Sequence, residues 1–365
     1  MTFFKSIFKT KEQPIHTYED FWKWFERNSK TFYKVVKEQS EIEKKFFDKL
    51  SPKLNELKDG FWYLTGMYNE DTAELVITAD GSIKNIVFVE ELILASPKIN
   101  GWKFTALKPP SEVQEVSIET SGYKFNTDKL NFYANQHPDF PDEIDISIVH
   151  TDVVDENKSS ITNGIYIFLD NYLGELDFAV TIDNLRVAGR NEREKELIPI
   201  EKLKDYLKWR QKEFIEKYDG VRHNTEKDEY LILETELDSG NAMIAVINTH
   251  LLQWDRKASH PWILTVEIPY DGSNKNGMPE EKTYALLHKI EDQITAELKD
   301  FEGYLNIGRQ TGKNVREIYF ACKDFRKPSK VIHNIQRNYY EQVTISYEIY
   351  KDKYWQSFNH FNPVA

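Results

Sequence analysis

The chain has 365 residues with a formal net charge of −12, and 40% of its residues are hydrophobic. This length predicts two or more domains, and the apolar content is sufficient for packed cores, which excludes a wholly disordered chain. The single cysteine, Cys322, excludes an internal disulfide framework and a metal site built on several cysteines. Residues 61–150 hold 14 acidic and 6 basic side chains, a balance that disfavours binding to nucleic acid.

The start of the chain mixes bulky apolar and basic side chains without the apolar run of a secretory signal. Two interpretations are open: a short amphipathic helix that touches a membrane, or a terminus that packs its phenylalanines on the protein body. A segment this short anchors weakly, and the chain has no run near the ~20 apolar residues that span a bilayer. We therefore expect a cytoplasmic protein without stable membrane insertion. The residues concerned are Phe3, Phe4, Ile7 and Phe8 with Lys5, Lys9 and Lys11.

Apolar residues recur at near-helical spacing over residues 18–58, which predicts a helical region that ends at Gly60. The next segments are predicted as a hairpin, a helix and a strand, at residues 61–68 with 74–78, 87–95 and 102–107. Further along, strands are predicted at residues 130–134, 144–149 and 165–169, and within 179–187. The polar residues 152–163 are expected to form a surface loop, and residues 200–218 to form a helix.

The polar segment from His223 to Asp228 lacks apolar periodicity and is the predicted linker between domains. Residues 1–220 are predicted as an N-terminal region of helices and antiparallel sheet. This region is either one domain or two similar small sheets, at residues 61–108 and 128–190, since each has a strand–strand–helix–strand order.

The C-terminal third has the clearest pattern. Residues 230–234 and 242–248 predict a hairpin, and residues 262–268 alternate as in a strand buried on one face. An apolar stripe follows Pro279 at helical spacing. Strands at 304–308 and 315–322, a helix at 329–337 and a strand at 343–350 complete the pattern. This β-α-β-β-α-β order predicts a ferredoxin-like domain over residues 228–361 and an α+β chain. The stripe consists of Leu287, Ile290, Ile294 and Leu298.

Several short motifs in this third combine helix caps, tight turns and strand aromatics: Gly277-Met-Pro-Glu, Leu287-His-Lys-Ile-Glu-Asp, Gly308-Arg309 with Thr311-Gly312, Arg316-Glu-Ile-Tyr319-Phe320, and Asp352 with Trp355. Together they resemble the bacterial domain-of-unknown-function family 695. The segments Ala95 to Trp102 and Leu173-Gly-Glu175 resemble the N-terminal part that accompanies this domain in some members. Some relatives also carry a domain similar to ribonuclease E activity regulator B, a protein inhibitor, so the resemblance implies interaction rather than catalysis.

Basic residues gather at the turn after Gly308, where Arg309, Lys313 and Arg316 form a candidate anion site. Guanidinium forks suit phosphate or carboxylate. The alternative is a solvated loop whose charges pair with nearby acids. A Walker phosphate loop is not favoured, because three residues separate Gly308 from Gly312 and no Ser or Thr follows the lysine.

The sheet of the predicted ferredoxin-like domain offers a candidate protein-binding face. If its apolar positions, Leu305 and Ile318 among them, face the two helices, alternation places polar residues and tyrosines on the other side. The alternative is that the 230–248 hairpin or the N-terminal region covers this face. The candidate residues are Glu267, Tyr304, Asn306, Glu317, Tyr319 and Glu348.

No residue pattern indicates a catalytic site, a metal site or a cofactor. The nine histidines lack helical metal-ligand spacing, and Cys322 lies on an apolar strand, where a thiol is inert. Acidic clusters at 142–145 and at Glu175 with Asp177 are interpreted as a solvated loop and a helix start.

Two functions remain. The first is a non-enzymatic protein that binds or regulates another protein; the alternative is an enzyme or small-anion receptor that uses Arg309 and Arg316. The oligomeric state cannot be read from the residues.

Overall fold

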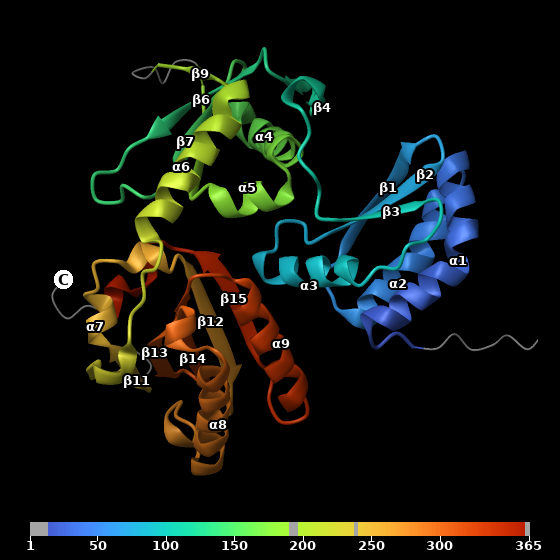
Figure 1. Cartoon of the computed structure of the whole chain (residues 1–365). Helices are drawn as coiled ribbons and strands as arrows, with labels where there is room; N and C mark the ends of the chain where they lie inside the picture. Colours follow the sequence, from blue (N-terminus) through green and yellow to red (C-terminus); the bar gives the residue numbers. More distant parts are fainter. Residues whose placement is uncertain (1–13, 190–195, 237–239, 362–365) are drawn as a thin grey trace, which may run out of the picture. The chain divides into compact units, whose positions relative to one another are not determined.

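The computed structural model describes residues 14–189, 196–236 and 240–361; the N-terminal Phe and Lys segment lies outside this part. The chain folds into two compact units (Figure 1). The first holds residues up to Asp80 together with 88–108, and the second holds residues 81–87 and 109–365. Helices and several separate sheets occur along the chain, which confirms the predicted α+β class.

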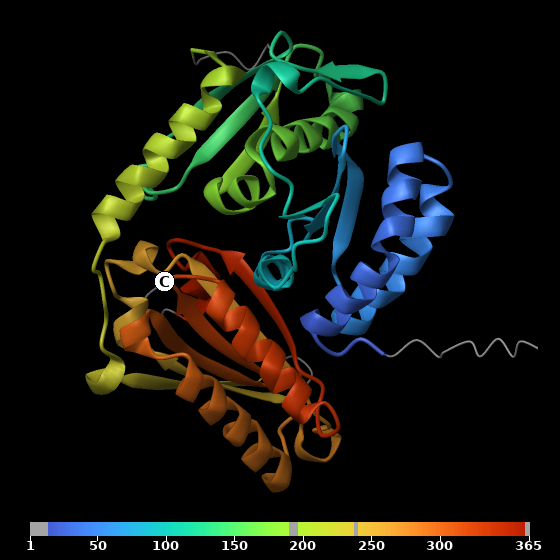
Figure 2. The ribbon, with the colours of Figure 1, turned by 45° about the vertical axis from the view of Figure 1, so that its right-hand side comes forward.

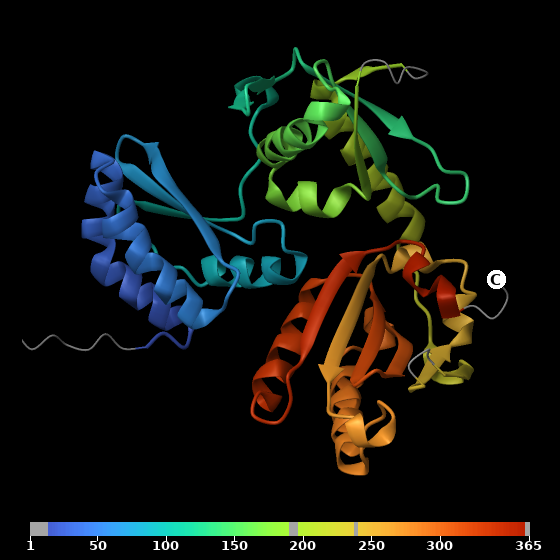
Figure 3. The ribbon, with the colours of Figure 1, turned by 180° about the vertical axis from the view of Figure 1, so that it is seen from behind.

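In the first unit, helices pack on one face of a three-stranded sheet (Figure 3). α1 (Tyr18–Glu38) begins at Thr17, whose side chain accepts from the Asp20 N–H in a capping box. The chain turns at Gln39, in the left-handed region, and continues through a π-helical turn (Glu43–Phe47) into α2 (Asp48–Leu57). The predicted helical region is confirmed, with a break after Glu38.

The sheet of this unit is formed by β1 (Trp62–Asn69), β2 (Thr72–Thr78) and β3 (Trp102–Ala106). β1 and β2 are antiparallel, whereas β2 and β3 are parallel because α3 (Ile83–Leu94) connects them. The core beneath the helices is aromatic. Its ring contacts involve Phe21, Trp22, Phe25, Phe32, Phe46, Trp102 and Phe104.

The middle part of the chain contributes these elements: β4 (Ile118–Thr120), β5 (Tyr123–Phe125), β6 (Leu130–Asn135), β7 (Asp145–His150), α4 (Lys158–Leu173), α5 (Glu175–Thr181), β8 (Asn184–Ala188), β9 (Ile198–Pro199) and α6 (Leu203–Tyr218). Four strands form a sheet in the order β8-β7-β6-β9. β8 runs parallel to β7 because α4 and α5 lie between them in the chain. Apolar residues of α4 and α6 pack with those of β6 and β7 in one core.

One predicted strand and half of one predicted loop are wrong here. Residues 165–169 lie within α4, and the stretch expected to be a loop contains the start of that helix at Lys158. Ile165, Phe168, Leu169 and Tyr172 are buried at the 3.6-residue period of a helix. A short apolar run by itself is consistent with a helix or with a buried strand, and the packing of this segment in the fold selects the helix. Helix α4 approaches the β4–β5 hairpin closely at Gly164, where a Cβ would lie 2.0 Å from the Phe125 ring.

The C-terminal part contributes the following elements: β10 (Tyr230–Glu236), β11 (Ala242–Asn248), α7 (Thr249–Leu252), β12 (Trp262–Pro269), α8 (Glu281–Glu297), β13 (Tyr304–Gly312), β14 (Val315–Cys322), α9 (Arg326–Tyr339), β15 (Ser346–Lys351) and a 3-10 segment (Gln356–Phe361). Six strands form one antiparallel sheet in the order β10-β11-β13-β14-β12-β15. α8 and α9 lie against the sheet (Figure 2). The predicted stripe from Leu287 to Leu298 is buried.

The chain order β12-α8-β13-β14-α9-β15 is the predicted β-α-β-β-α-β order. The narrower description as a ferredoxin-like domain stays a prediction. On the second face of the sheet, Ile263, Tyr319 and Ala321 form a core with Trp355 and Phe358 from the end of the described chain. Both faces of the central strands are therefore buried.

Candidate functional site

Arg309 and Arg316, the basic pair predicted to bind an anion, converge on a carboxylate of the protein itself. Glu291 of α8 accepts from Arg309 Nη1 at 2.8 Å through one oxygen and from Arg316 Nη1 at 3.2 Å through the other. Arg316 is 1% exposed and also donates to Thr311 Oγ1 at 3.0 Å. Burial lowers the pKa of Arg316, and the charge of Glu291 acts in the opposite direction. Through Glu291, the two guanidinium groups thus link α8 to the β13–β14 hairpin.

Lys313, the third predicted residue, lies apart from this triad. It is exposed in the turn between β13 and β14, where it and Asn314 both have positive φ. The predicted hairpin turn is therefore present. The role of Arg309, Lys313 and Arg316 as an external anion site stays a prediction, and Glu291 occupies the position that an anion would take between the two arginines.

The six residues predicted as a protein-binding face do not share one side of the sheet. Tyr304 lies opposite Cys322 and Asn306 lies opposite Phe320, whereas Leu305 lies opposite Ala321. Because directly paired residues share a face, Tyr304 and Asn306 point to the side of α9, where the Lys327 ammonium lies over the Tyr304 ring. Glu267, Glu317, Tyr319 and Glu348 lie on the other side.

Burial further separates these six residues. Tyr304 and Tyr319 are buried, Tyr319 against the rings of Phe358 and Phe361. Glu267 and Glu348 are exposed. The expectation that Leu305 faces the helices is wrong because the pairing register, which the strand sequences do not reveal, decides the face of each residue.

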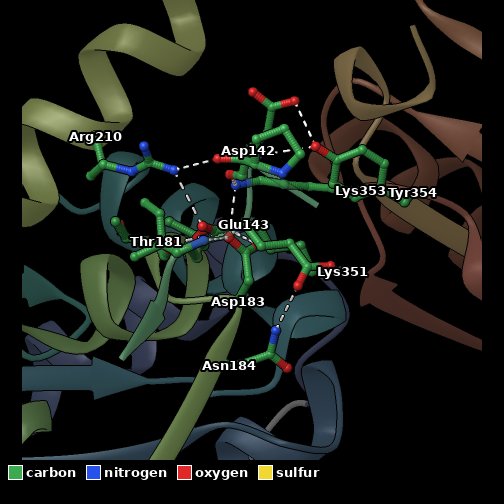
Figure 4. A network of polar contacts seen from close by, with 12 residues as sticks. Asp142, Glu143, Thr181, Asp183, Asn184, Arg210, Lys351, Lys353 and Tyr354 are labelled. Carbon is green, nitrogen blue, oxygen red and sulfur yellow. Dashed lines mark hydrogen bonds and ion pairs between the residues drawn. The ribbon is translucent and has the colours of Figure 1, made fainter. Parts of the chain in front are cut away.

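A polar cluster joins the middle part of the chain to the C-terminal part, both within the second unit (Figure 4). We name it the Asp183 cluster: Asp142, Glu143, Asp183, Lys351 and Lys353. Asp183 lies between the two lysines, with Oδ1 at 2.8 Å from Lys351 Nζ and Oδ2 at 2.7 Å from Lys353 Nζ. Lys351 is the last residue of β15 and Lys353 follows it, whereas Asp183 directly precedes β8. The cluster therefore forms only when the C-terminal sheet packs against the loop before β8.

The lysines complete their hydrogen bonds on main-chain oxygens. Lys351 donates to the carbonyls of Val180 at 2.7 Å and Thr181 at 3.2 Å, and Lys353 donates to that of Asp142 at 2.6 Å. Each ammonium therefore binds main-chain oxygen as well as the Asp183 carboxylate. Buried lysines paired in this way hold surfaces together and have no free electron pair for nucleophilic chemistry while they remain protonated.

Asp142 is held by phenol and ammonium donors. Its Oδ2 accepts from Tyr218 at 2.7 Å and from Tyr354 at 2.8 Å, while Oδ1 is 2.7 Å from Lys217 Nζ. Burial acts to raise the pKa of Asp142, but the hydrogen bonds from these three residues together lower it below its usual range. Burial and the bond to Asp142 raise the pKa of both tyrosines, so neither phenol serves as a base near neutral pH.

Glu143 differs from Asp142 in that its pKa is raised overall. Burial, and then the neighbouring charge of Asp183, raise its pKa. It accepts from Asn184 at 2.9 Å and from Gln356 at 3.3 Å. A cavity of about 480 Å³ lies beside the cluster, lined by Asp139, Asp142, Arg256 and Tyr354 among others. The other lining residues are Pro138, Pro141, Lys217, Tyr218 and Asp255.

The pKa of Lys351 predicts a measurable pH dependence. Burial lowers it to about 8 from an ordinary value of 10.5, while the charge of Asp183 acts in the opposite direction. The folded protein releases this proton near pH 8 and the unfolded chain keeps it up to about pH 10.5, so the free energy of unfolding contributed by Lys351 rises with pH between these values. For Lys351→Met we expect this rise to be absent, a difference from the parent of roughly 3 kcal/mol across the window.

Denaturant unfolding at several pH values between 7 and 10.5 measures this difference. Lys30→Met removes an exposed lysine of α1 and serves as the control. Parallel pH curves for Lys351→Met and the parent protein would show that Lys351 does not titrate in this window.

Cys322 is expected to be unreactive in the folded protein. It is fully buried at the end of β14, and burial raises its pKa well above the ordinary value. A thiol reagent should label it only in denaturant, which mass spectrometry of native and denatured samples would show. Rapid labelling of the native protein would contradict a purely structural role. Among the described residues no group of three or more His, Cys, Asp or Glu side chains could hold a metal ion, and no described helix could span a membrane.

An apolar strip lies on the face of the first unit's sheet opposite α1 and α2. Tyr63 contacts Phe47 on the helix side, so by alternation Trp62 and Leu64 point away from the helices. Tyr68 lies at a bulge, and the ammonium of Lys103, which pairs with Glu74 opposite Gly66, lies over its ring on the same face as Trp62 and Leu64. Trp62, Leu64 and Tyr68 are 59%, 49% and 57% exposed, respectively. We name these three residues the β1 strip. Exposed apolar side chains gathered on one face of a strand are typical of contact sites.

The sequence did not single out the Asp183 cluster or the β1 strip. The sequence offers two signals: the acidic residues at 142–145, whose pattern suggests a solvated loop, and the alternation of Trp62, Leu64 and Tyr68, which indicates a strand but not which side is covered. Glu175 does begin α5 as predicted; it is buried and accepts from the Gly81 N–H at 3.1 Å.

Comparison with known proteins gives one match. Residues 233–361 match the model of a family of unknown function, DUF695, and no family model matches the N-terminal region. No curated protein and no solved structure matches the chain. The C-terminal third of the chain is therefore similar to the DUF695 family, and the predicted resemblance is confirmed over that range.

Proposed function

We propose that the protein is a non-enzymatic module that binds another protein through the β1 strip. The supporting observation is the exposure of a tryptophan, a leucine and a tyrosine on one face of β1. Trp and Tyr are enriched at binding hot spots because each offers a large contact area at low cost in conformational entropy. A single buried cysteine fits a cytoplasmic location, which we include in the proposal.

The partner surface should be mainly apolar. Next to the strip, Glu74 is 2.8 Å from Lys103, and the Lys103 ammonium lies over the Tyr68 ring, so the charges beside the strip are already paired. Such a surface offers little to a phosphate backbone, and the acidic chain repels one. An apolar patch with a neutral rim instead suits another protein.

We propose a non-enzymatic role because the buried charged groups are paired with one another. Asp183, Lys351 and Lys353 bind one another, and Glu291 binds both arginines. Groups committed to structural pairs do not act as acids, bases or nucleophiles without first losing those pairs.

Affinity purification from the native host, followed by mass spectrometry of co-eluting proteins, tests the proposal. The double variant Trp62→Ser with Leu64→Ser should fold and lose the partner, since truncating exposed residues costs little stability. The matched control is Trp209→Ser with Ile215→Ser on α6, where the two side chains are 53% and 58% exposed. The partner should remain bound to the control.

Binding of the purified partner to each variant should then reproduce the pattern in a two-component measurement. A partner retained equally by the strip variant and the control would contradict a role of the β1 strip. Turnover of a small molecule by the purified protein would contradict the non-enzymatic assignment.

A further inference from the structure

Strand β10 is one outer edge of the six-stranded sheet. Its antiparallel ladder with β11 is regular from Tyr230, opposite Asn248, to Glu236, opposite Ala242, and contains no bulge. A strand in this position has hydrogen bonds on one side only, so the main-chain groups of alternate residues face outwards.

The residues that face outwards can be assigned. The Thr249 N–H donates to the Glu229 carbonyl at 3.0 Å, in the same register as the β10–β11 ladder. Hydrogen-bonded pairs alternate along an antiparallel ladder, so Leu231 and Leu233 also bond to β11. The N–H and C=O groups of Tyr230, Ile232 and Glu234 therefore point away from the sheet.

This edge lacks the protection that natural sheets use. β10 contains no proline, no lysine and no bulge, and it carries exposed apolar side chains at Tyr230 (49%) and Ile232 (62%). Its charged residues, Glu234 and Glu236, are both acidic and exposed. Within the described part of the chain, the edge therefore combines main-chain donors and acceptors that pair with no other strand, an apolar centre and negative charge at one end.

We propose that β10 binds an extended segment of a partner protein by strand addition, and that this segment has apolar residues beside Lys or Arg. Main-chain hydrogen bonds would supply affinity, and the pairing of basic side chains with Glu234 and Glu236 would supply specificity and orientation. A second copy of this chain is disfavoured as the occupant, because its own β10 brings the same acids and no base. The proposal concerns a surface separate from the β1 strip and stands or falls independently of it.

A fluorescent peptide with a central run of valines and a pair of lysines at each end is the probe, and fluorescence anisotropy measures its binding. The matched peptide carries glutamates in place of the lysines. Only the lysine peptide should bind, more weakly at high salt because ions screen exposed charges. Glu234→Lys with Glu236→Lys should lower its affinity about tenfold or more, whereas Glu70→Lys, in an exposed turn, should not.

Main-chain pairing has its own test. Ile232→Pro removes an outward N–H and leaves the ladder to β11 intact, because proline is tolerated on an edge strand where the N–H faces solvent. Ile232→Ala removes the side chain and keeps the N–H. The proline variant should lose about tenfold or more in affinity relative to the alanine variant, with melting temperature reported for both.

Several results would overturn the proposal: no binding of the lysine peptide at millimolar concentration, equal binding of both peptides, or equal binding by the proline and alanine variants. A dimer in light scattering that Ile232→Pro dissociates would assign the edge to a second copy instead. Peptide binding by the Trp62→Ser and Leu64→Ser variant should equal that of the parent, so failure here and failure of the β1 strip are distinguishable.

Discussion

Replacing Glu291 with glutamine is expected to lower the free energy of unfolding by about 3–5 kcal/mol, because removing one member of a buried ionic group leaves the others unpaired. Glu291 is buried and holds Arg316, which is almost inaccessible to water, and Arg309 through separate oxygens. Denaturant unfolding measures the loss. Glu297→Gln, at the exposed end of the same helix, should change stability little.

A smaller side chain at the same position tests the predicted anion site. Glu291→Ala empties the position between the two guanidinium groups, so phosphate or sulfate should raise the melting temperature of this variant while leaving the parent protein unchanged, since ligand binding to the folded state stabilises it. This result would show that Arg309 and Arg316 form an anion site that the protein fills itself. A loss below about 1 kcal/mol for Glu291→Gln would contradict the assignment of Arg316 as a buried charge.

Replacing Asp183 with asparagine is expected to lower the free energy of unfolding by a similar amount, about 3–5 kcal/mol. The change leaves the ammonium groups of Lys351 and Lys353 buried without their carboxylate. The amide oxygen retains an acceptor for the Ile144 N–H, which donates to Asp183 at 2.7 Å, so the loss should reflect charge. Unfolding of Asp139→Asn, an exposed aspartate in a loop, provides the control.

The pH profile of the Asp183 variant gives a second readout. Lys351 has a pKa of about 8 in the folded parent protein, so it becomes neutral at higher pH and its need for a counter-charge falls. Without Asp183 the pKa of Lys351 falls further, so the part of the Asp183→Asn deficit that comes from Lys351 should shrink as pH rises towards 8 and be lost above it. In the double variant with Lys351→Met, the second substitution should recover part of the lost stability, because it removes one of the unpaired charges. A constant deficit across this range would contradict a charge-based role for Asp183.

Most elements of the C-terminal part follow from local sequence. The alternation in β12 and the stripe from Leu287 to Leu298 each repeat at the period of one element, and burial agrees with both. Caps and turns also act locally, as in the capping box at Thr17 and the positive φ of Lys313 and Asn314 in the turn after β13. Such patterns involve neighbours within a few residues, so the sequence carries them directly.

The predictions that were wrong all concern features set by contacts between residues distant in the chain, which the local sequence does not encode. The run Ile165 to Leu169 is too short to separate a helix from a buried strand, and contacts with β4, β5 and the core place it in a helix. The faces of Tyr304 and Tyr319 depend on register, where a shift of one residue exchanges every side chain between faces.

Residue patterns alone were enough to establish the α+β class, most of the helices and strands and the resemblance of the C-terminal third to DUF695. They were not enough to establish which charges pair, which required the folded arrangement. Asp183 meets Lys353, and Glu291 meets Arg316, over chain separations of 170 and 25 residues. Residue types along the chain do not specify which distant carboxylate an ammonium or guanidinium meets, because that depends on strand register and on how the parts of the second unit pack together.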